Sequence, residues 1–464
     1  MMREFSLFTY PIAVFSVPIL CNFNFHRLNM KKLLLLPILV LNFFVGIGQS
    51  SSSKTSTLNI KRPTLKYDQS SFESERLKIT DNVIQGWVDK NWMNGGVGLV
   101  LRDGKIAYYK AFGYDNIEKK TTMQVDHIFR IASQTKAITS TAVMILFEEG
   151  KFLLDEPVSK FIPAFKNPKV LDKFNPSDSS FTTIAAKREI TIRDLLTHTS
   201  GIGYAQIGSG PANAIYAKNG VTSGIGIENQ TLEDNMKKLA KLPLFHQPGE
   251  KFTYGLNTDL LGYLVEVVSG MKLDEFMSKR IFEPLGMKDT YFNIPTEKQS
   301  RLVSLYSQIN GNLFYPPEST LMQGTKVYRD YPNLGFPMMS GGGGLSSTIM
   351  DYAIFLQMML NEGTYNGVRI LSRNSVRMMT MNQIGDLNNG VNKFGLGFGI
   401  TTEKGSAKLP TQEGTYEWGG MFATSYWVDP KEKIVGLFFR NIYPTQNGDI
   451  SDRFRVMVYQ AIKD

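Results

Sequence analysis

Strand-like segments stand near both ends of this chain, with a long stretch of helices and loops between them. The first pair, at 96–102 and 105–112, is joined by Asp103-Gly104, a dipeptide that readily adopts the positive φ angles of a tight hairpin. Strand patterns return at 424–428 and 434–440. A chain patterned in this way predicts two sub-domains that share one cleft.

Helical periodicity marks five segments in which apolar residues recur every three or four positions. They are residues 74–92, 133–150, 260–269, 349–360 and 451–462. Glycine follows the second segment at Gly150, where a helix commonly ends. We therefore expect an α+β fold over residues 75–464, with an antiparallel sheet flanked by helices and a mostly helical sub-domain over about 150–330.

The first 48 residues are typical of a leader. Met30-Lys31-Lys32 precedes an apolar run at 33–45, and Gly46-Ile47-Gly48 then places small residues where signal peptidase reads them. We predict a signal peptide at 30–48, an upstream extension at 1–29 and a polar linker at 49–74. These features predict a periplasmic or secreted protein, which contacts a membrane only if the leader remains as an anchor.

Cysteine content and charge exclude several classes of protein. The one cysteine, Cys21, lies in the leader, so the mature chain is expected to hold no disulfide, catalytic thiolate or thiolate metal site. The formal net charge is +9, but the basic residues are scattered, without a run of five or more. We therefore expect no nucleic-acid partner.

One candidate nucleophile stands at the head of a helix. In Ser133-Gln134-Thr135-Lys136, positions i and i+3 share a helical face, so the lysine amine can approach the serine hydroxyl. A serine becomes a good nucleophile when a neighbouring base takes its proton. The same Ser-x-x-Lys pattern also occurs at 51–54 and 269–272, so the four residues alone are weak evidence.

Other catalytic schemes lack their motifs in this sequence. There is no Gly-x-Ser-x-Gly, no His-Glu-x-x-His and no Walker Gly-x-x-x-x-Gly-Lys. His198 is interpreted as a polar residue at a helix end, and the glycine run at 341–344 as a tight loop beside the cleft. No metal site or cofactor is expected.

From about residue 75 to 460 the chain resembles the serine β-lactamase and penicillin-binding-protein family, especially its class C and esterase-like branch. The likeness rests on five strings: Phe129-Arg130-Ile131-Ala132-Ser133-Gln134-Thr135-Lys136, the segments 149–158 and 190–201, Pro248-Gly249-Glu250-Lys251-Phe252-Thr253-Tyr254, and Glu283-Pro284-Leu285-Gly286-Met287. It implies a nucleophilic Ser133 in the cleft between the sub-domains.

The family's second motif, Tyr-x-Asn, is altered here. Tyr254 is present, and the resemblance implies that it exchanges protons with Ser133 together with Lys136. Leu256 stands where the family has asparagine, and Asn257 follows one residue late. We retain Asn257 as a candidate substrate contact, although its shifted position points it elsewhere.

The third motif is a strand that lines the cleft, here Trp418-Gly419-Gly420-Met421. By analogy, the backbone N–H groups of Ser133 and Met421 form the oxyanion hole, and the residues 418–420 contact substrate. Trp418 cannot replace the cation with which relatives hold a carboxylate, because an indole offers an apolar face and one donor.

These departures favour an exported, esterase-like serine hydrolase that cleaves neutral ester or amide acyl groups. A charge-assisted hydrogen bond contributes about 1.5–3 kcal/mol, so losing it weakens recognition of a carboxylate. Two alternatives remain: a D-stereospecific peptidase, penicillin-binding protein or β-lactamase acting on a peptidoglycan-like substrate, and a non-catalytic binding module on the same fold.

Overall fold

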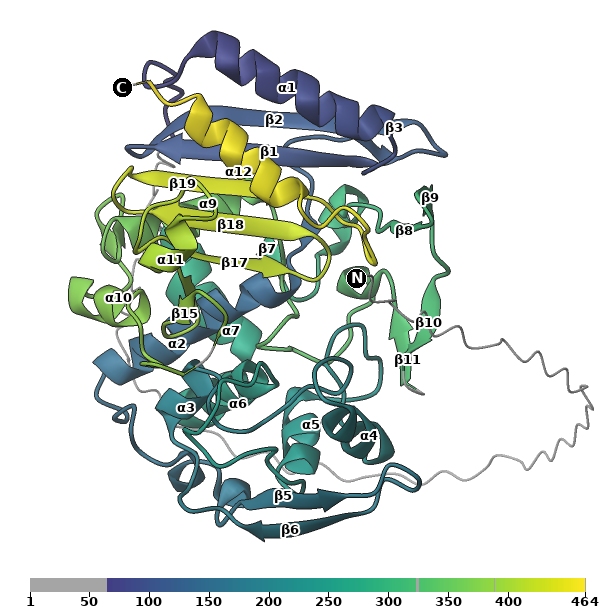
Figure 1. Ribbon diagram of the computed structural model, residues 1–464, viewed down its shortest axis with the longest axis vertical. Helices are drawn as coiled ribbons and strands as arrows, with labels where there is room; N and C mark the ends of the chain where they lie inside the picture. The colour runs from purple at the N-terminus through teal and green to yellow at the C-terminus, as the bar shows by residue number, and fades with distance from the viewer. Residues whose placement is uncertain (1–64, 323–324, 388, 464) are drawn as a thin grey trace, which may run out of the picture. The chain divides into compact units, whose positions relative to one another are not determined.

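The computed structural model describes residues 65–322, 325–387 and 389–463 (Figure 1). All of these residues belong to one compact unit. The leader at 1–48 and most of the linker lie outside the described residues. Within the described part of the chain, no helix is both long and apolar enough to cross a membrane.

The largest sheet joins strands from the two ends of the chain. Its antiparallel order is β15-β16-β17-β18-β19-β1-β2-β3. The bounds are β1 Gly95–Arg102, β2 Lys105–Asn116, β3 Thr121–Thr122, β15 Lys393–Phe394, β16 Gly399–Ile400, β17 Tyr416–Gly420, β18 Thr424–Asp429 and β19 Ile434–Phe439. The predicted hairpin is confirmed, since Asp103 and Gly104 have φ angles of 49° and 72°.

Alternating side chains of the sheet enter two different hydrophobic clusters. On β19, Val435 and Leu437 join one cluster, whereas Ile434 and Phe438 join the other. Successive side chains of a strand point to opposite faces of the sheet, so this alternation means that both faces of β19 are covered. Helices α1 (Ser74–Asp89) and α12 (Ile450–Gln460) supply apolar side chains to the second cluster, and these helices lie together at one side of the sheet (Figure 1).

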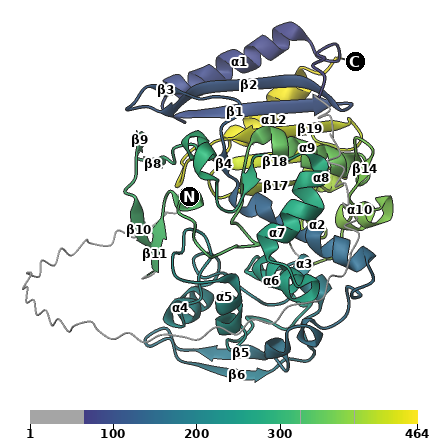
Figure 2. The same ribbon diagram turned by 180° about the vertical axis from the view of Figure 1, so that it is seen from behind.

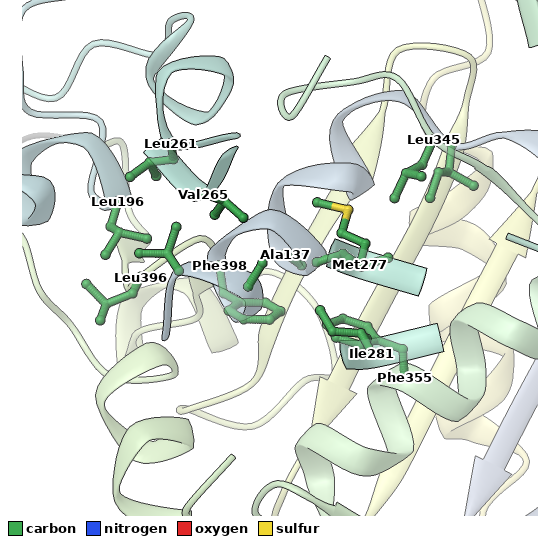
Figure 3. Close-up of a cluster of buried hydrophobic side chains, with 14 of the residues drawn as sticks. Ala137, Leu196, Leu261, Val265, Met277, Ile281, Leu345, Phe355, Leu396 and Phe398 are labelled. Carbon is green, nitrogen blue, oxygen red and sulfur yellow. The ribbon is translucent and has the colours of Figure 1, made fainter. Parts of the chain in front are cut away.

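The other face of the sheet packs against α2 (Thr135–Glu148) and α9 (Ile349–Leu360). Helix α2 is buried along nearly its whole length and also contacts α6 (Asn257–Ser269). In Figure 3, Ala137 of α2 lies among Leu261 and Val265 of α6 and Met277 of α7. Helix α2 is therefore the central element between the sheet and the helical part.

The helical part contains short helices and several small hairpins. Figure 2 shows α3, α4, α5 and α6 on the side of α2 away from α1. The helices are α3 Ile192–Leu196, α4 Gly210–Lys218, α5 Leu232–Leu239, α7 Leu273–Met277 and α8 Glu283–Leu285, and α10 Arg373–Met379 and α11 Glu403–Ser406 follow later in the chain. The small strands are β4 Phe129–Arg130, β5 Lys169–Phe174, β6 Phe181–Ala185, β7 Thr290–Tyr291, β8 Ser307–Ile309, β9 Asn312–Phe314, β10 Ser319–Met322, β11 Thr325–Tyr328, β12 Ser346–Ser347, β13 Thr364–Tyr365 and β14 Val368–Arg369.

The hairpins inside 150–330 differ from the mostly helical expectation. Strand β6 is exposed at every residue, and such a strand lacks the alternating buried positions by which a sequence signals a strand. The five helices that periodicity predicted are all present. Helix α6 begins at Asn257, three residues earlier than expected, because residues 257–259 are polar but buried.

Glycine at position 436 allows the sheet to close over Trp427. A Cβ atom on Gly436 would lie 2.2 Å from the indole ring of the fully buried Trp427 on β18. We expect Gly436→Ala to lower the free energy of unfolding by about 1–3 kcal/mol through overpacking. Gly86→Ala on α1 meets no atom within 4 Å, and it should instead raise stability by about 0.5–1 kcal/mol. Urea unfolding of both variants tests this pair, and equal effects would contradict the packing argument.

Candidate active site

Ser133 sits where the chain turns from a strand into the central helix. Strand β4 ends at Arg130, a 3₁₀ turn covers Ala132–Gln134, and α2 follows. Ala132 is fully buried with a φ angle of +43°. A left-handed backbone at a non-glycine residue costs on the order of 1–3 kcal/mol, and it persists only where the surroundings hold it. The turn therefore fixes the serine next to it.

The ammonium group of Lys136 is surrounded by three acceptors. Its Nζ donates to Ser133 Oγ at 3.2 Å, to the hydroxyl oxygen of Tyr204 at 3.0 Å and to the carbonyl oxygen of Gly342 at 2.6 Å. A protonated lysine has three N–H donors and no acceptor, so these contacts use its full capacity. The expected approach of Lys136 to Ser133 is thus present in the structure.

Tyr254 lies against the same ammonium. Lys136 Nζ is 4.7 Å from the centre of the Tyr254 ring, close enough for a cation–π attraction. The indole Nε1 of Trp418 donates to the Tyr254 hydroxyl at 3.4 Å, and the two rings are 5.5 Å apart. The fold therefore brings Ser133, Lys136 and Tyr254 together, although Ser133 and Tyr254 are 121 residues apart along the chain.

Sequence reasoning missed Tyr204. This tyrosine is nearly buried, its hydroxyl contacts Lys136, and its ring lies 5.4 Å from that of Tyr254. It stands in a loop without periodicity, so no helical or strand pattern marked it. The one sequence feature that could have pointed to Tyr204 is its position, three residues after the string at 190–201 that carries the family likeness.

Burial and charge act in opposite directions on Lys136. Burial by itself lowers the pKa of Lys136, but Tyr204, Tyr254 and Asp259 together outweigh burial and raise it above its ordinary value. Burial raises the pKa of Tyr204, which Lys136 partly offsets. Lys136 is consequently held as an ammonium, in agreement with its three acceptors.

The glycine run at 341–344 forms the tight loop beside the cleft that we expected, and it supplies the carbonyl of Gly342 to Lys136. A Cβ on Gly342 would lie 2.3 Å from Asp259 Oδ2, so only glycine fits there. Asp259 Oδ1 accepts from Ser340 Oγ at 2.6 Å and from the Gly342 N–H at 3.3 Å. Burial raises the pKa of Asp259. The buried carboxyl thus positions the loop that holds the lysine.

Asn257 does not face the cleft, and its expected role as a substrate contact is corrected. Its side chain is fully buried, where Oδ1 accepts from Ser200 Oγ and Nδ2 donates to His198 Nδ1 at 2.9 Å. The extra residue before Asn257 turns its side chain into the core at the start of α6. Asn257 instead ties the segment at 198–200 to the helix that follows Tyr254.

His198 is a buried structural residue, as its sequence context indicated. The backbone N–H of Gly255 also points to His198 Nδ1, at 3.4 Å, so this nitrogen is the acceptor and the ring proton belongs on Nε2. Burial, followed by the positive charge of Lys136, holds the pKa of His198 well below its ordinary value. His198 therefore remains neutral beneath the Tyr254 ring, 4.8 Å away.

Met421 follows the last paired residue of β17, beside the nucleophile. A Cβ on Gly420 would lie 2.3 Å from the carbonyl oxygen of Ile131, so glycine lets the end of β17 approach the turn before Ser133. Ser133 and Met421 line one cavity, which also includes Tyr204 and Tyr254. This arrangement suits the predicted oxyanion hole.

Trp418, Gly419 and Gly420 are not among the described residues that line this cavity. The indole of Trp418 instead packs between Tyr254 and Phe394, whose ring centre is 5.2 Å from its own. Trp418 thus contacts the tyrosine, and its contact with substrate stays a prediction. Across the described residues, no group of three or more His, Cys, Asp or Glu side chains is arranged to hold a metal ion.

Comparisons with known proteins find relatives along most of this chain. The family model described as Beta-lactamase matches residues 80–460. Esterase EstB of Burkholderia gladioli is 30% identical over 381 residues, covering 79% of this chain and 90% of EstB. A putative D-alanyl-D-alanine carboxypeptidase of Escherichia coli strain K12 is 28% identical over 398 residues, covering 81% of this chain and 84% of that protein.

A solved structure extends the likeness to three dimensions. EstCE1, described as a hydrolase with promiscuous acyltransferase activity, superposes with a TM-score of 0.72 at 26% identity. The match covers 83% of this chain and 99% of EstCE1. The α+β architecture with its antiparallel sheet and flanking helices is therefore shared with esterases and penicillin-binding-protein relatives.

The contact between Tyr204 and Lys136 leads to a kinetic expectation. Tyr204→Phe should lower kcat for nitrophenyl acetate by about tenfold to a hundredfold, because the ammonium loses one acceptor, while KM changes little. The limb of the kcat/KM profile that belongs to Lys136 should move to lower pH, since the phenol helps to raise its pKa.

Tyr216→Phe is the matched control for that variant. The Tyr216 hydroxyl is also buried and accepts from the Gly203 N–H of the same loop at 3.3 Å, but it does not contact Lys136. Tyr216→Phe should therefore leave the pH limb in place. An unmoved limb in Tyr204→Phe would show that Tyr204 only packs.

Proposed function

Because this chain belongs to the beta-lactamase family and is a serine hydrolase, we propose that it cleaves neutral esters through an acyl-enzyme on Ser133. The observation that carries the proposal is the 3.2 Å hydrogen bond from Lys136 Nζ to Ser133 Oγ, with the Tyr254 ring 4.7 Å from the same ammonium. Lys136 occupies a lone pair of the serine oxygen, so the hydroxyl proton is free to leave toward another acceptor.

In the proposed reaction, Tyr254 acts as a phenolate, and Ser133 Oγ attacks the carbonyl carbon of the substrate while its proton passes to the Tyr254 oxygen. The backbone N–H groups of Ser133 and Met421 stabilise the oxyanion that forms. As the tetrahedral intermediate collapses, the leaving alkoxide takes the proton from Tyr254 and departs as an alcohol. Water then attacks the acyl-enzyme by the same route, which releases the acid and restores Ser133.

Lys136 contributes positive charge in this scheme. Its raised pKa and three acceptors support an ammonium in the free enzyme, and Tyr254 is then the group that receives the proton of Ser133.

The preference for neutral substrates rests on Trp418. In this position the indole gives its one N–H to the Tyr254 hydroxyl, which leaves no cation there for a substrate carboxylate. The similarity to EstB favours ester hydrolysis. The likeness to a putative D-alanyl-D-alanine carboxypeptidase supports a second candidate, a D-stereospecific peptidase on the same catalytic groups.

We also propose that the protein is exported. The support is the Lys31-Lys32 pair, the apolar run at 33–45 and the small residues at 46–48. The protein isolated from its natural host is expected to begin at Gln49, as read by N-terminal sequencing. A chain that begins upstream of the apolar run would overturn cleavage at this position.

The chain offers a matched control for the nucleophile. Ser133→Ala should reduce turnover of 4-nitrophenyl acetate by at least about 10³-fold and abolish stoichiometric labelling by a fluorophosphonate. Ser269→Ala alters the same Ser-x-x-Lys pattern at the end of α6, where the hydroxyl donates to the Val265 carbonyl and accepts from the Met271 N–H, and it should leave both readouts intact.

Parallel assays separate the candidates. Faster turnover of nitrophenyl esters than of a chromogenic β-lactam or a D-alanyl-D-alanine peptide would support the esterase. The reverse order would support the peptidase, and binding of these compounds without turnover would point to a non-catalytic module. Persistent labelling in Ser133→Ala would overturn the assignment of the nucleophile.

A further inference from the structure

The cavity at Ser133 continues well beyond the catalytic groups. Its volume is about 360 Å³, within the usual range for small-molecule sites. One end is formed by Ser133, Tyr204 and Tyr254. The rest is lined by residues within 206–225, 305–320, 327–331 and 421–444, of which the reaction proposed above uses only Met421.

The far wall of the cavity is a hydrophobic cluster separate from the two cores that flank the sheet. We call this cluster the side wall; its members are Ala132, Ile225, Leu305, Tyr328, Tyr331, Phe336 and Phe422. It begins at Ala132, the residue directly before the nucleophile, and five of its members line the cavity. Five apolar members of the side wall therefore line the same cavity as Ser133.

The one formal charge in the described lining of the cavity is engaged by neighbouring groups. Among the described residues that line it, Arg329 alone carries a formal charge. The Arg329 guanidinium donates to Asp330 Oδ2 at 2.6 and 3.0 Å and to the carbonyl of Pro316 at 2.6 Å, and it lies 4.0 Å from the centre of the Tyr315 ring. These contacts leave little of the guanidinium to bind a substrate carboxylate.

We propose that this cavity binds a bulky, uncharged apolar group of the substrate, which is carried on either the acyl or the alcohol half of the ester. The inference rests on the proposed ester hydrolysis and names the substrate class. Each methylene buried along the side wall raises affinity by about fourfold, while a charge at the far end would lose its hydration without gaining a partner.

The hairpin β10–β11 offers positions at which to narrow the cavity. Thr320 and Val327 face each other across this hairpin, and both line the cavity. Thr320 is exposed, so Thr320→Phe adds bulk without disturbing a buried core. Thr183→Phe on β6 is the matched control, because Thr183 is an exposed threonine in another two-stranded hairpin, outside the cavity lining.

The first experiment measures binding without catalysis. The full chain carrying Ser133→Ala is titrated calorimetrically with 1-butanol, 1-octanol and 8-hydroxyoctanoate. We expect octanol to bind at least about tenfold more tightly than butanol and than 8-hydroxyoctanoate, whose charge lies at the far end of the chain. Adding Thr320→Phe should weaken octanol binding at least tenfold, and adding Thr183→Phe should not.

The second experiment measures turnover with Ser133 intact. One series varies the acyl chain from acetyl to octanoyl with 4-nitrophenol as the leaving group, and another varies the alcohol from ethyl to octyl with acetate as the acyl group. A rise of kcat/KM with length in one series identifies the half of the ester that occupies the cavity. Thr320→Phe should reduce that rise at least tenfold.

The outcomes separate this inference from the proposed function. Octanol binding without turnover of any ester would overturn ester hydrolysis and leave the cavity assignment standing. Equal binding of butanol and octanol, tighter binding of 8-hydroxyoctanoate, or flat rates in both series would overturn the cavity assignment. If both Thr320→Phe and Val327→Phe left octanol binding unchanged, the hairpin would not border the bound group and the assignment would fail.

Discussion

The buried ammonium of Lys136 is the interaction on which the rest of the active site depends. A charge removed from water is costly unless polar groups surround it, and here one serine, one tyrosine and one backbone carbonyl do so. Each acceptor comes from a different part of the chain, so the lysine fixes the distances between those parts. The same contacts keep Lys136 charged and leave the hydroxyl proton of Ser133 free to move. Stability of the site and its chemistry therefore have one physical origin.

The groups behind the site support this arrangement through packing. Asp259 holds the glycine loop that presents a carbonyl to Lys136, and Asn257 joins neutral His198 to the start of α6. Helix α2 carries Lys136, and the 3₁₀ turn directly before it carries Ser133, into the space between the sheet and the helical part, where nearly all residues of α2 are buried. The catalytic side chains are consequently mounted on rigid elements, although Tyr204 and Tyr254 stand in loops.

Two residues at the cleft, Trp418 and Arg329, both argue against the binding of a substrate carboxylate. Trp418 replaces a cation with an indole whose N–H is given to Tyr254, and Arg329 across the cavity is engaged by Asp330. Most of the residues that line the cavity are aromatic or aliphatic. A site of this kind gains binding free energy by excluding water from an apolar group, whereas a carboxylate would enter without a free cation to meet it.

By itself the sequence determined the elements and the reacting pair. The four strands β1, β2, β18 and β19, the principal helices and the Ser133–Lys136 spacing follow from local patterns, which depend only on near neighbours along the chain. Only the tertiary structure decided what depends on contacts between distant segments. It turned Asn257 into the core, placed Tyr204 beside Lys136, set Trp418 against Tyr254 and gathered the side wall from five segments of the chain. No pattern in a single sequence encodes such neighbours, because their selection rests on how loops without periodicity pack after the helices and sheet have formed.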